Sequence, residues 1–165
     1  MWSAEFDIIN PNVNEELVER TQEILGHQLP ASYIKLMTQK NGGYLDGRVI
    51  KLPEIIPQAL SYYSDEGYLS IGKIAGINPI PWGLGSISYS LRMIEEWDLP
   101  QDLVLLDGDG HTWVALDYRS KKVEPSVIFI ESKGNSCIIL AEKFEDFVAL
   151  METYNEVFYD DGELR

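Results

Sequence analysis

The spacing of apolar residues predicts two short helices near the N-terminus. The first runs to about residue 25, and its apolar side carries Val13, Leu17, Ile24 and Leu25. Asn12 or Asn14 can cap its first turn, and Glu15 follows Asn12 at the spacing of a capping box. Gly26 then ends the helix.

The second helix lies within residues 29–43, directly after the link His27-Gln28. Pro30 suits the first helical position, where a missing N–H costs nothing. Tyr33, Leu36 and Met37 share one face. The run Asn41-Gly42-Gly43 ends the helix, because glycine accepts the left-handed conformation. The short link predicts an antiparallel or angled helix pair, with His27 solvated.

Short apolar or alternating runs bounded by turn residues predict a set of strands. They lie at residues 48–52 (in an extended segment 44–52), 68–71, 103–106, 112–118, 126–131 and 137–141. In the fourth of these, Val114, Leu116 and Tyr118 alternate with Trp113, Ala115 and Asp117. Glycine and proline punctuate residues 72–85 and predict irregular chain there. We expect Trp82 in this segment to plug the core, with an exposed contact as the alternative.

Two further helices are predicted at residues 87–97 and 143–158. Leu91, Ile94 and Trp97 point inward in the first. The second has a wide apolar stripe of Phe144, Phe147, Val148, Met151, Tyr154 and Phe158, which should pack on the sheet. Residues 159–165 form an acidic tail that we expect to fray. We therefore predict one α+β domain over residues 1–165, with a mostly antiparallel sheet between an N-terminal helix pair and a C-terminal amphipathic helix.

Several motifs of the chain occur in the order known from one superfamily. They are Leu29-Pro30-x-x-Tyr33 followed by Asn41-Gly42-Gly43, then Leu99-Pro100, Asp107-Gly-Asp-Gly110, Leu116-Asp117, and Phe144 with Phe147. This order resembles the SUKH superfamily of Smi/Knr-like domains over residues 13–157, although residues 72–85 do not align with the pattern. The resemblance implies either an immunity protein that neutralises a polymorphic toxin, often a nuclease, or a scaffold linked to cell-wall assembly.

The charge of the chain narrows the choice of partner. The net charge is −14, which argues against nucleic acid or an anionic membrane and favours a basic partner. A general role in solubility is the alternative. Seven acidic residues and no lysine or arginine lie between positions 95 and 117; the acids are Glu95, Glu96, Asp98, Asp102, Asp107, Asp109 and Asp117.

The N-terminal segment and the cysteine content suggest a cytoplasmic protein. The first residues carry no basic side chain and no long apolar run, so we expect no signal peptide. No stretch has the length of a membrane helix. Cys137 is the only cysteine, which excludes an internal disulfide and a CxxC site, and its apolar neighbours predict a buried hydrophobic role.

The segment Asp107-Gly-Asp-Gly-His111 is the main candidate for metal chemistry. It begins like a calcium loop, but Tyr118 stands where the loop needs a bidentate Glu. A looser site with Asp107, Asp109 and Asp117 is an alternative, as part of a metal-dependent hydrolase. A hairpin turn is favoured, since Asp-Gly is a preferred turn dipeptide.

We see no other set of residues suited to catalysis or to a cofactor. Two histidines give few ways to build a Ser-His-Asp or Cys-His arrangement. The segment 82–86 has glycines but no following lysine to hold a phosphate.

We therefore predict a protein without catalytic residues, metal or cofactor that binds another protein. The expected contact residues are Glu95, Glu96, Asp98, Asp107, Asp109, His111 and Trp113, with Trp97 and Tyr118 as further aromatic anchors. The expected partner is a cognate toxin, a basic protein and possibly a nuclease by the family resemblance. A non-catalytic scaffold or regulatory module is the second interpretation.

Overall fold

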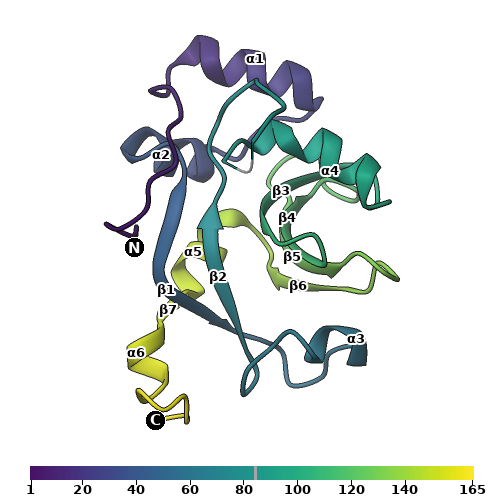
Figure 1. The fold of residues 1–165 in the computed structure, drawn as a ribbon. Coiled ribbons are helices and arrows are strands. Elements are labelled where there is room, and N and C mark those ends of the chain that lie inside the picture. Colours follow the sequence, from purple (N-terminus) through teal and green to yellow (C-terminus); the bar gives the residue numbers. More distant parts are fainter. Residues whose placement is uncertain (84) are drawn as a thin grey trace.

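The computed structural model describes residues 1–83 and 85–165. The elements run α1 (Glu15–Leu25), α2 (Ala31–Gln39), β1 (Gly43–Lys51), α3 (Gln58–Ser61), β2 (Tyr68–Ile74), the 3-10 turn η1 (Ile87–Tyr89), α4 (Ser90–Glu96), β3 (Leu103–Gly108), β4 (Thr112–Asp117), β5 (Ser126–Glu131), β6 (Cys137–Ala141), α5 (Phe144–Leu150), β7 (Glu152–Thr153) and α6 (Tyr154–Val157) (Figure 1). This arrangement confirms the α+β class. The glycine-containing segment 82–86 includes Leu84, which lies outside the described residues.

The ends of α1 follow from its caps. Asn14 is the N-cap, and its side chain accepts a hydrogen bond from the Leu17 N–H at 2.8 Å. Gly26 closes the helix in the left-handed conformation, with φ of 72°. Both end signals were therefore correct, although Ile24 is exposed and not on the buried side.

The Asn41-Gly42-Gly43 run does more than end α2. The Asn41 amide donates to the carbonyl oxygens of Pro11 and Ile77, and its oxygen accepts from the Ile77 N–H. Gly42 has φ of 80°, and a Cβ at this position would lie 2.6 Å from the Gly76 nitrogen. Close approach of two backbones therefore requires glycine here. The motif fastens the chain after β2 to the end of α2.

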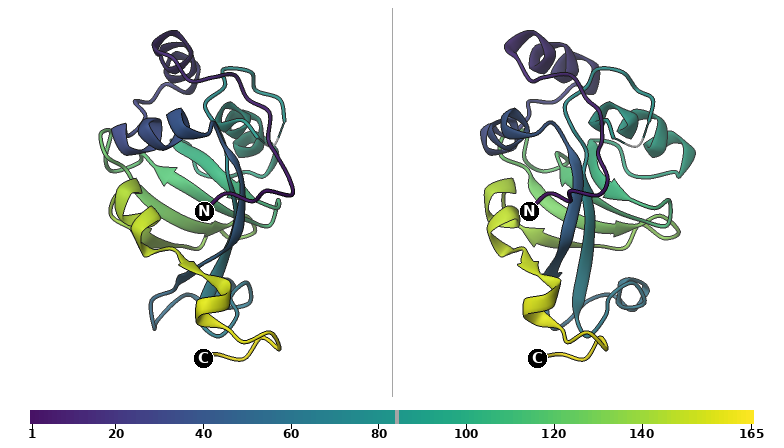
Figure 2. Two further views of the ribbon diagram at one scale, coloured as in Figure 1. Left: turned by 90° about the vertical axis from the view of Figure 1, so that its left-hand side faces the viewer. Right: turned by 60° about the vertical axis from the view of Figure 1, so that its left-hand side comes forward.

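Two antiparallel sheets form the centre of the protein. One has the strand order β2-β1-β7 and the other the order β3-β4-β5-β6. They meet where the Ala75 N–H donates to the Leu106 carbonyl oxygen at 2.8 Å. Figure 2 shows the long β1–β2 pair running past the four-stranded sheet, with α2 and α5 on the same side.

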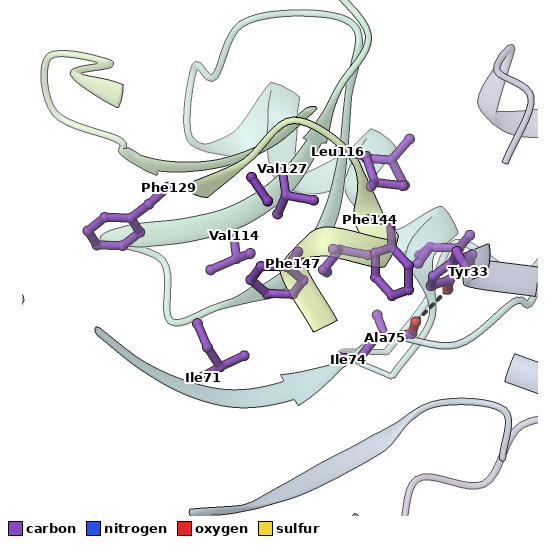
Figure 3. Packing of buried hydrophobic residues seen from close by; sticks show 14 of the residues in the cluster. Tyr33, Ile71, Ile74, Ala75, Val114, Leu116, Val127, Phe129, Phe144 and Phe147 are labelled. Carbon is purple, nitrogen blue, oxygen red and sulfur yellow. Dashed lines mark hydrogen bonds between the residues drawn. The ribbon is translucent and has the colours of Figure 1, made fainter. Parts of the chain in front are cut away.

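The four-stranded sheet is buried on both faces. One face contributes Val114, Leu116, Val127 and Phe129 to the main core, where Phe144 and Phe147 of α5 pack (Figure 3). The other face packs Trp113 and Ala115 against Met93 and Ile94 of α4. This two-sided burial explains why its strands are nearly continuous apolar runs.

Tyr33 connects α2 to this core. The residue is fully buried, and its hydroxyl donates to the Ala75 carbonyl oxygen at 2.6 Å (Figure 3). Its ring packs edge-on against Phe144, with the centroids 5.2 Å apart. Burial raises the pKa of the Tyr33 hydroxyl well above its ordinary value, so it remains a donor at any physiological pH.

The prediction of one helix over residues 143–158 was wrong. The chain leaves the helical conformation at Met151, where φ is −70° and ψ is 127°. The short strand β7 then pairs with β1, with Arg48 opposite Thr153. The apolar stripe is thus divided: Phe147 enters the main core, whereas Phe158 packs with Val49 in a separate cluster.

The acidic tail was expected to fray, but the structure folds it back. The Tyr159 N–H donates to the Glu163 carbonyl oxygen, and the Arg165 N–H donates to the Val157 carbonyl oxygen. The Arg165 guanidinium lies 4.5 Å from the centre of the Tyr159 ring. Figure 2 shows this yellow segment as a compact turn at the lower end of the molecule.

Three other residues differ from their predicted environment. Trp82 is 69% exposed, so it does not plug the core, and the alternative prediction of an exposed side chain is the correct one. Leu91 was expected to point inward and is exposed, because α4 buries Met93 and Ile94 instead. Cys137 is only partly buried, since β6 is an edge strand, and its sulfur lies 3.7 Å from the Arg119 guanidinium.

His27 is the clearest exception to the predicted solvated link. Its side chain is only 10% exposed, stacks on the Tyr118 ring at 4.3 Å and contacts Asp102 at 3.2 Å. Burial lowers the pKa of His27 below its ordinary value and outweighs the opposing effect of Asp102, while the nearby Lys122 lowers it further. The link is therefore part of the packed structure.

Candidate protein-binding surface

Three segments meet at the end of the four-stranded sheet that carries the predicted contact residues. They are the end of α4, the turn between β3 and β4, and the turn between β5 and β6. The Ser132 N–H donates to the His111 carbonyl oxygen, which joins the two turns. The Asn135 amide donates to the Asp98 carbonyl oxygen at 3.3 Å, which joins the second turn to the end of α4.

Trp97 holds the first turn against α4. A Cβ added to Gly110 would lie 2.7 Å from the Trp97 ring, so the ring packs directly on the glycine backbone. Gly110 also has φ of 97°, a conformation that favours glycine. The Trp97 ring meets the His111 ring edge-on at 6.0 Å. Trp97 is partly exposed, so the surface includes an aromatic edge beside acidic groups.

Asp109 shapes the turn between β3 and β4. Its Oδ1 accepts hydrogen bonds from the backbone N–H groups of His111 and Thr112, both at 2.9 Å. Burial alone would raise the pKa of Asp109, but these two hydrogen bonds outweigh it and lower the pKa. The carboxylate is therefore charged under physiological conditions, and the hairpin-turn interpretation of this segment holds.

Glu131 holds the neighbouring turn from inside. It is buried, and its carboxylate accepts from the backbone N–H groups of Lys133, Gly134 and Ser136. Burial raises the pKa of Glu131, yet these donors reverse the shift and lower it. The β5–β6 turn is thus organised around a charge that the predicted contact set did not include.

The structure separates the predicted contact residues into two groups. Glu95, Glu96, Asp98, Asp109 and His111 are exposed, and we call these five residues the acidic surface. Trp113 is 4% exposed and Tyr118 is fully buried, so neither can anchor a partner, and that part of the prediction was wrong. Trp113 instead supports the surface from below, since its ring packs on Gly108.

Asp107 also has an internal role. Its Oδ2 accepts from the N–H groups of Gly72 and Lys73, and its Oδ1 accepts from the Gly108 N–H. The Lys73 ammonium lies 3.5 Å from the same carboxylate. The side chain is 16% exposed. Asp107 therefore links β2 to β3 and has little capacity left for a partner.

The 95–117 stretch contains no basic residue, but its negative charge is smaller in the folded protein than the sequence suggests. Basic residues outside this stretch contact four of the seven acids. Lys73 contacts Asp107, Arg119 contacts Asp117 through two hydrogen bonds, and Lys122 lies 3.5 Å from Asp102. The fourth contact joins Arg92 to Glu96 at 3.5 Å, within the acidic surface. Among the described residues, Glu95, Asp98 and Asp109 are the carboxylates of this surface without a salt bridge.

The looser metal site does not form from the three aspartates proposed for it. Asp109 is at the start of the β3–β4 hairpin, whereas Asp117 ends β4, about 17 Å away at the rise of a strand. Burial raises the pKa of Asp117, but the hydrogen bonds from Arg119 outweigh this and lower it. Within residues 1–83 and 85–165, no group of three acidic, histidine or cysteine side chains is arranged to hold a metal.

The sequence did not identify a tyrosine pair beside the acidic surface. Tyr62 and Tyr63 follow α3, and their rings meet edge-on at 5.4 Å. They line a hollow that also contains Asp109 and Thr112 of the β3–β4 turn. Two adjacent tyrosines in a segment without apolar periodicity are a signal for exposed aromatic residues. Their position beside Asp109 could not be predicted, because Asp109 is distant in sequence.

The chain matches the model of the SMI1 / KNR4 family (SUKH-1) over residues 12–150, and it belongs to this family. None of the curated proteins matches it. The match includes the α2 end motif and all of the acidic surface. None of the helices in the described ranges is long and apolar enough to cross a membrane.

Proposed function

We propose that the protein is a cytoplasmic immunity protein that binds and neutralises a cognate toxin domain. The acidic surface is proposed as the contact region, and a basic toxin, for example a nuclease, as the partner. Membership of the SMI1 / KNR4 family supports a protein-binding role. The net charge of −14 supports a basic partner.

The arrangement of the acidic surface is the observation that carries the proposal. Its exposed carboxylates come from α4 and from the β3–β4 turn, which Trp97 and the β5–β6 turn hold together. A rigid set of charges loses little conformational entropy on binding. Opposite charge on a toxin would accelerate encounter, and the exposed edge of Trp97 would supply apolar contact.

A non-catalytic scaffold is the second candidate function. Membership of the SMI1 / KNR4 family is equally compatible with this role, since the match names no partner. The resemblance noted in the sequence links such members to cell-wall assembly. A scaffold and an immunity protein would use the same kind of surface, so the partner distinguishes them.

Coexpression with the product of the adjacent reading frame tests the immunity role. We expect wild-type protein to protect cells from that product and to form a one-to-one complex with it. A variant with Glu95, Glu96 and Asp98 each changed to Lys and Asp109 changed to Asn, which keeps the turn acceptor, should lose protection. A control with Glu19, Glu23 and Glu156 each changed to Lys and Asp160 changed to Asn has the same net charge and should protect.

Three outcomes of this test separate the proposals. Protection by the control alone supports the acidic surface as the contact region. Equal protection by both variants would place the contact elsewhere. Lack of protection by wild-type protein, together with lack of a complex, would argue against immunity and leave the scaffold.

A further inference from the structure

A groove runs between β2 and the β3–β4 turn and continues to the segment after α3. Its inner part, of about 260 Å³, lies between Gly72, Thr112 and Phe129. Its outer part, of about 370 Å³, lies between Tyr62, Asp65 and Thr112. Both parts are lined by Leu69, Ser70, Asp109 and Thr112, so they are continuous. Figure 1 shows α3 below the four-stranded sheet.

The charge of the groove has one sign. Its acidic side chains are Asp65, Asp107 and Asp109, and among the described residues no lysine, arginine or histidine lines it. Asp107 is occupied by its internal hydrogen bonds. The Oδ1 atom of Asp109 takes the turn hydrogen bonds, which leaves its Oδ2 atom as an acceptor. The groove therefore favours a cation.

Tyrosine rings provide the second feature of the groove. Tyr62 is 86% exposed and Tyr63 is 36% exposed, and Tyr68 lines the same outer part. The faces of aromatic rings attract guanidinium and ammonium groups, and arginine also stacks on them through its planar group. Exposed rings beside two carboxylates suit an arginine side chain.

The strand that forms one wall adds a third feature. β2 is an edge strand of its sheet. On the outer side of β2, the Gly72 N–H already donates to the Asp107 side chain, and Tyr68 exchanges two backbone hydrogen bonds with Asp65. Ser70 lies between these residues and shares their side of the strand, so its backbone groups face the groove. The backbone of an extended peptide can hydrogen-bond to such a residue.

We propose that this groove binds an extended, arginine-bearing segment of a basic partner protein. The arginine would lie against Tyr62 and pair with Asp65 and Asp109, while the backbone of the segment pairs with β2. The proposal rests on the proposed function in one respect, the basic character of the partner. It adds a second contact region next to the acidic surface, with Asp109 common to both.

Titration with a short peptide tests the groove directly. The probe is the capped peptide Gly-Arg-Gly-Arg-Gly, with Gly-Glu-Gly-Glu-Gly as its acidic counterpart, monitored through amide chemical shifts of the whole protein. We expect the basic peptide to shift resonances of residues 62–72 and 108–112. Binding should weaken as salt rises from about 50 mM to about 500 mM, because exposed charges are screened. The acidic peptide should cause no shifts.

Matched variants isolate the charge and the ring. Asp65→Asn with Asp109→Asn keeps the turn acceptor at Asp109 and removes two charges, so affinity should fall about tenfold. Tyr62→Ser should weaken binding about threefold, and its exposure makes misfolding no concern. Asp160→Asn with Asp161→Asn removes the same number of charges from the tail and should change affinity less than about twofold.

Three results of these titrations would overturn the proposal. Absence of shifts, shifts centred on the tail or α1, or equal weakening by both pairs of Asn substitutions would each refute the groove. Failure of wild-type protein to protect cells from the adjacent gene product, with peptide binding intact, would refute the immunity role alone. Protection without peptide binding would refute the groove alone.

Discussion

Replacement of Asn41 by alanine tests the physical role that the structure gives to the α2 end motif. The side chain makes three hydrogen bonds, at 2.7 Å to the Pro11 oxygen, 2.8 Å to the Ile77 oxygen and 2.7 Å from the Ile77 nitrogen. Each is worth about 0.5–1.5 kcal/mol, and the Ile77 groups would lose their partners in a buried position. We expect Asn41→Ala to lower the free energy of unfolding by about 2–4 kcal/mol.

Chemical denaturation measures this loss directly. A chain of this length should also melt about 5–15 °C lower, at about 2–4 °C per kcal/mol. Asn12→Ala is the matched control, since Asn12 is exposed, and it should change stability by less than about 0.5 kcal/mol. A loss below about 1 kcal/mol for Asn41→Ala would refute the view that this side chain fastens the chain after β2.

Two further stability predictions concern Gly42 in the α2 end motif and His27 in the link before α2. Gly42→Ala should lower the free energy of unfolding by at least about 2 kcal/mol, because the residue has positive φ and its Cβ would meet the Gly76 backbone. Gly67→Ala is the control: Gly67 has a similar φ but lies in open space, so the loss should be smaller. Equal losses in denaturant titration would contradict the steric argument. His27 has a lowered folded pKa, so the unfolded chain takes up a proton more readily as pH falls below about 6.5. The contribution of neutral His27 to stability is thus fully present above that pH and is lost below it. The free energy of unfolding of the wild-type protein should therefore fall more steeply between about pH 7.5 and pH 5.5 than that of His27→Gln. Parallel curves for the two proteins would argue against a lowered pKa of His27.

Local signals in the sequence located most of the elements. The caps at Asn14 and Gly26 act through contacts within a few residues, so their effect can be read from the chain. Gly42 also marks the end of α2 in the sequence, but its contact with the Gly76 backbone could not be read in this way. The break at Met151 could not be read in this way. It depends on pairing between β7 and β1, which are about a hundred residues apart in the chain. The uninterrupted apolar stripe gave no indication of it.

The site residues show the same limit. Trp113 in β4 and Tyr118 directly after it lie on opposite faces of the sheet. If only one face of the sheet were buried, one of these two side chains would be exposed. The structure covers both faces, since α4 packs on one of them. Asp107 was likewise wrongly predicted to be free for a partner protein, because its ion-pair partner Lys73 comes from β2. Exposure and ion pairing depend on which distant elements pack together.

The central claim is that the protein acts by binding a basic protein through its acidic surface. Titration of the purified adjacent gene product with the wild-type protein and with the variant that carries Lys at positions 95, 96 and 98 and Asn at position 109 tests it most directly. We predict that wild-type protein abolishes the toxic activity at one equivalent. The variant should associate at least about tenfold more slowly at low salt, since like charges now repel. Unchanged association of the variant, or wild-type protein that forms no complex, would contradict the account.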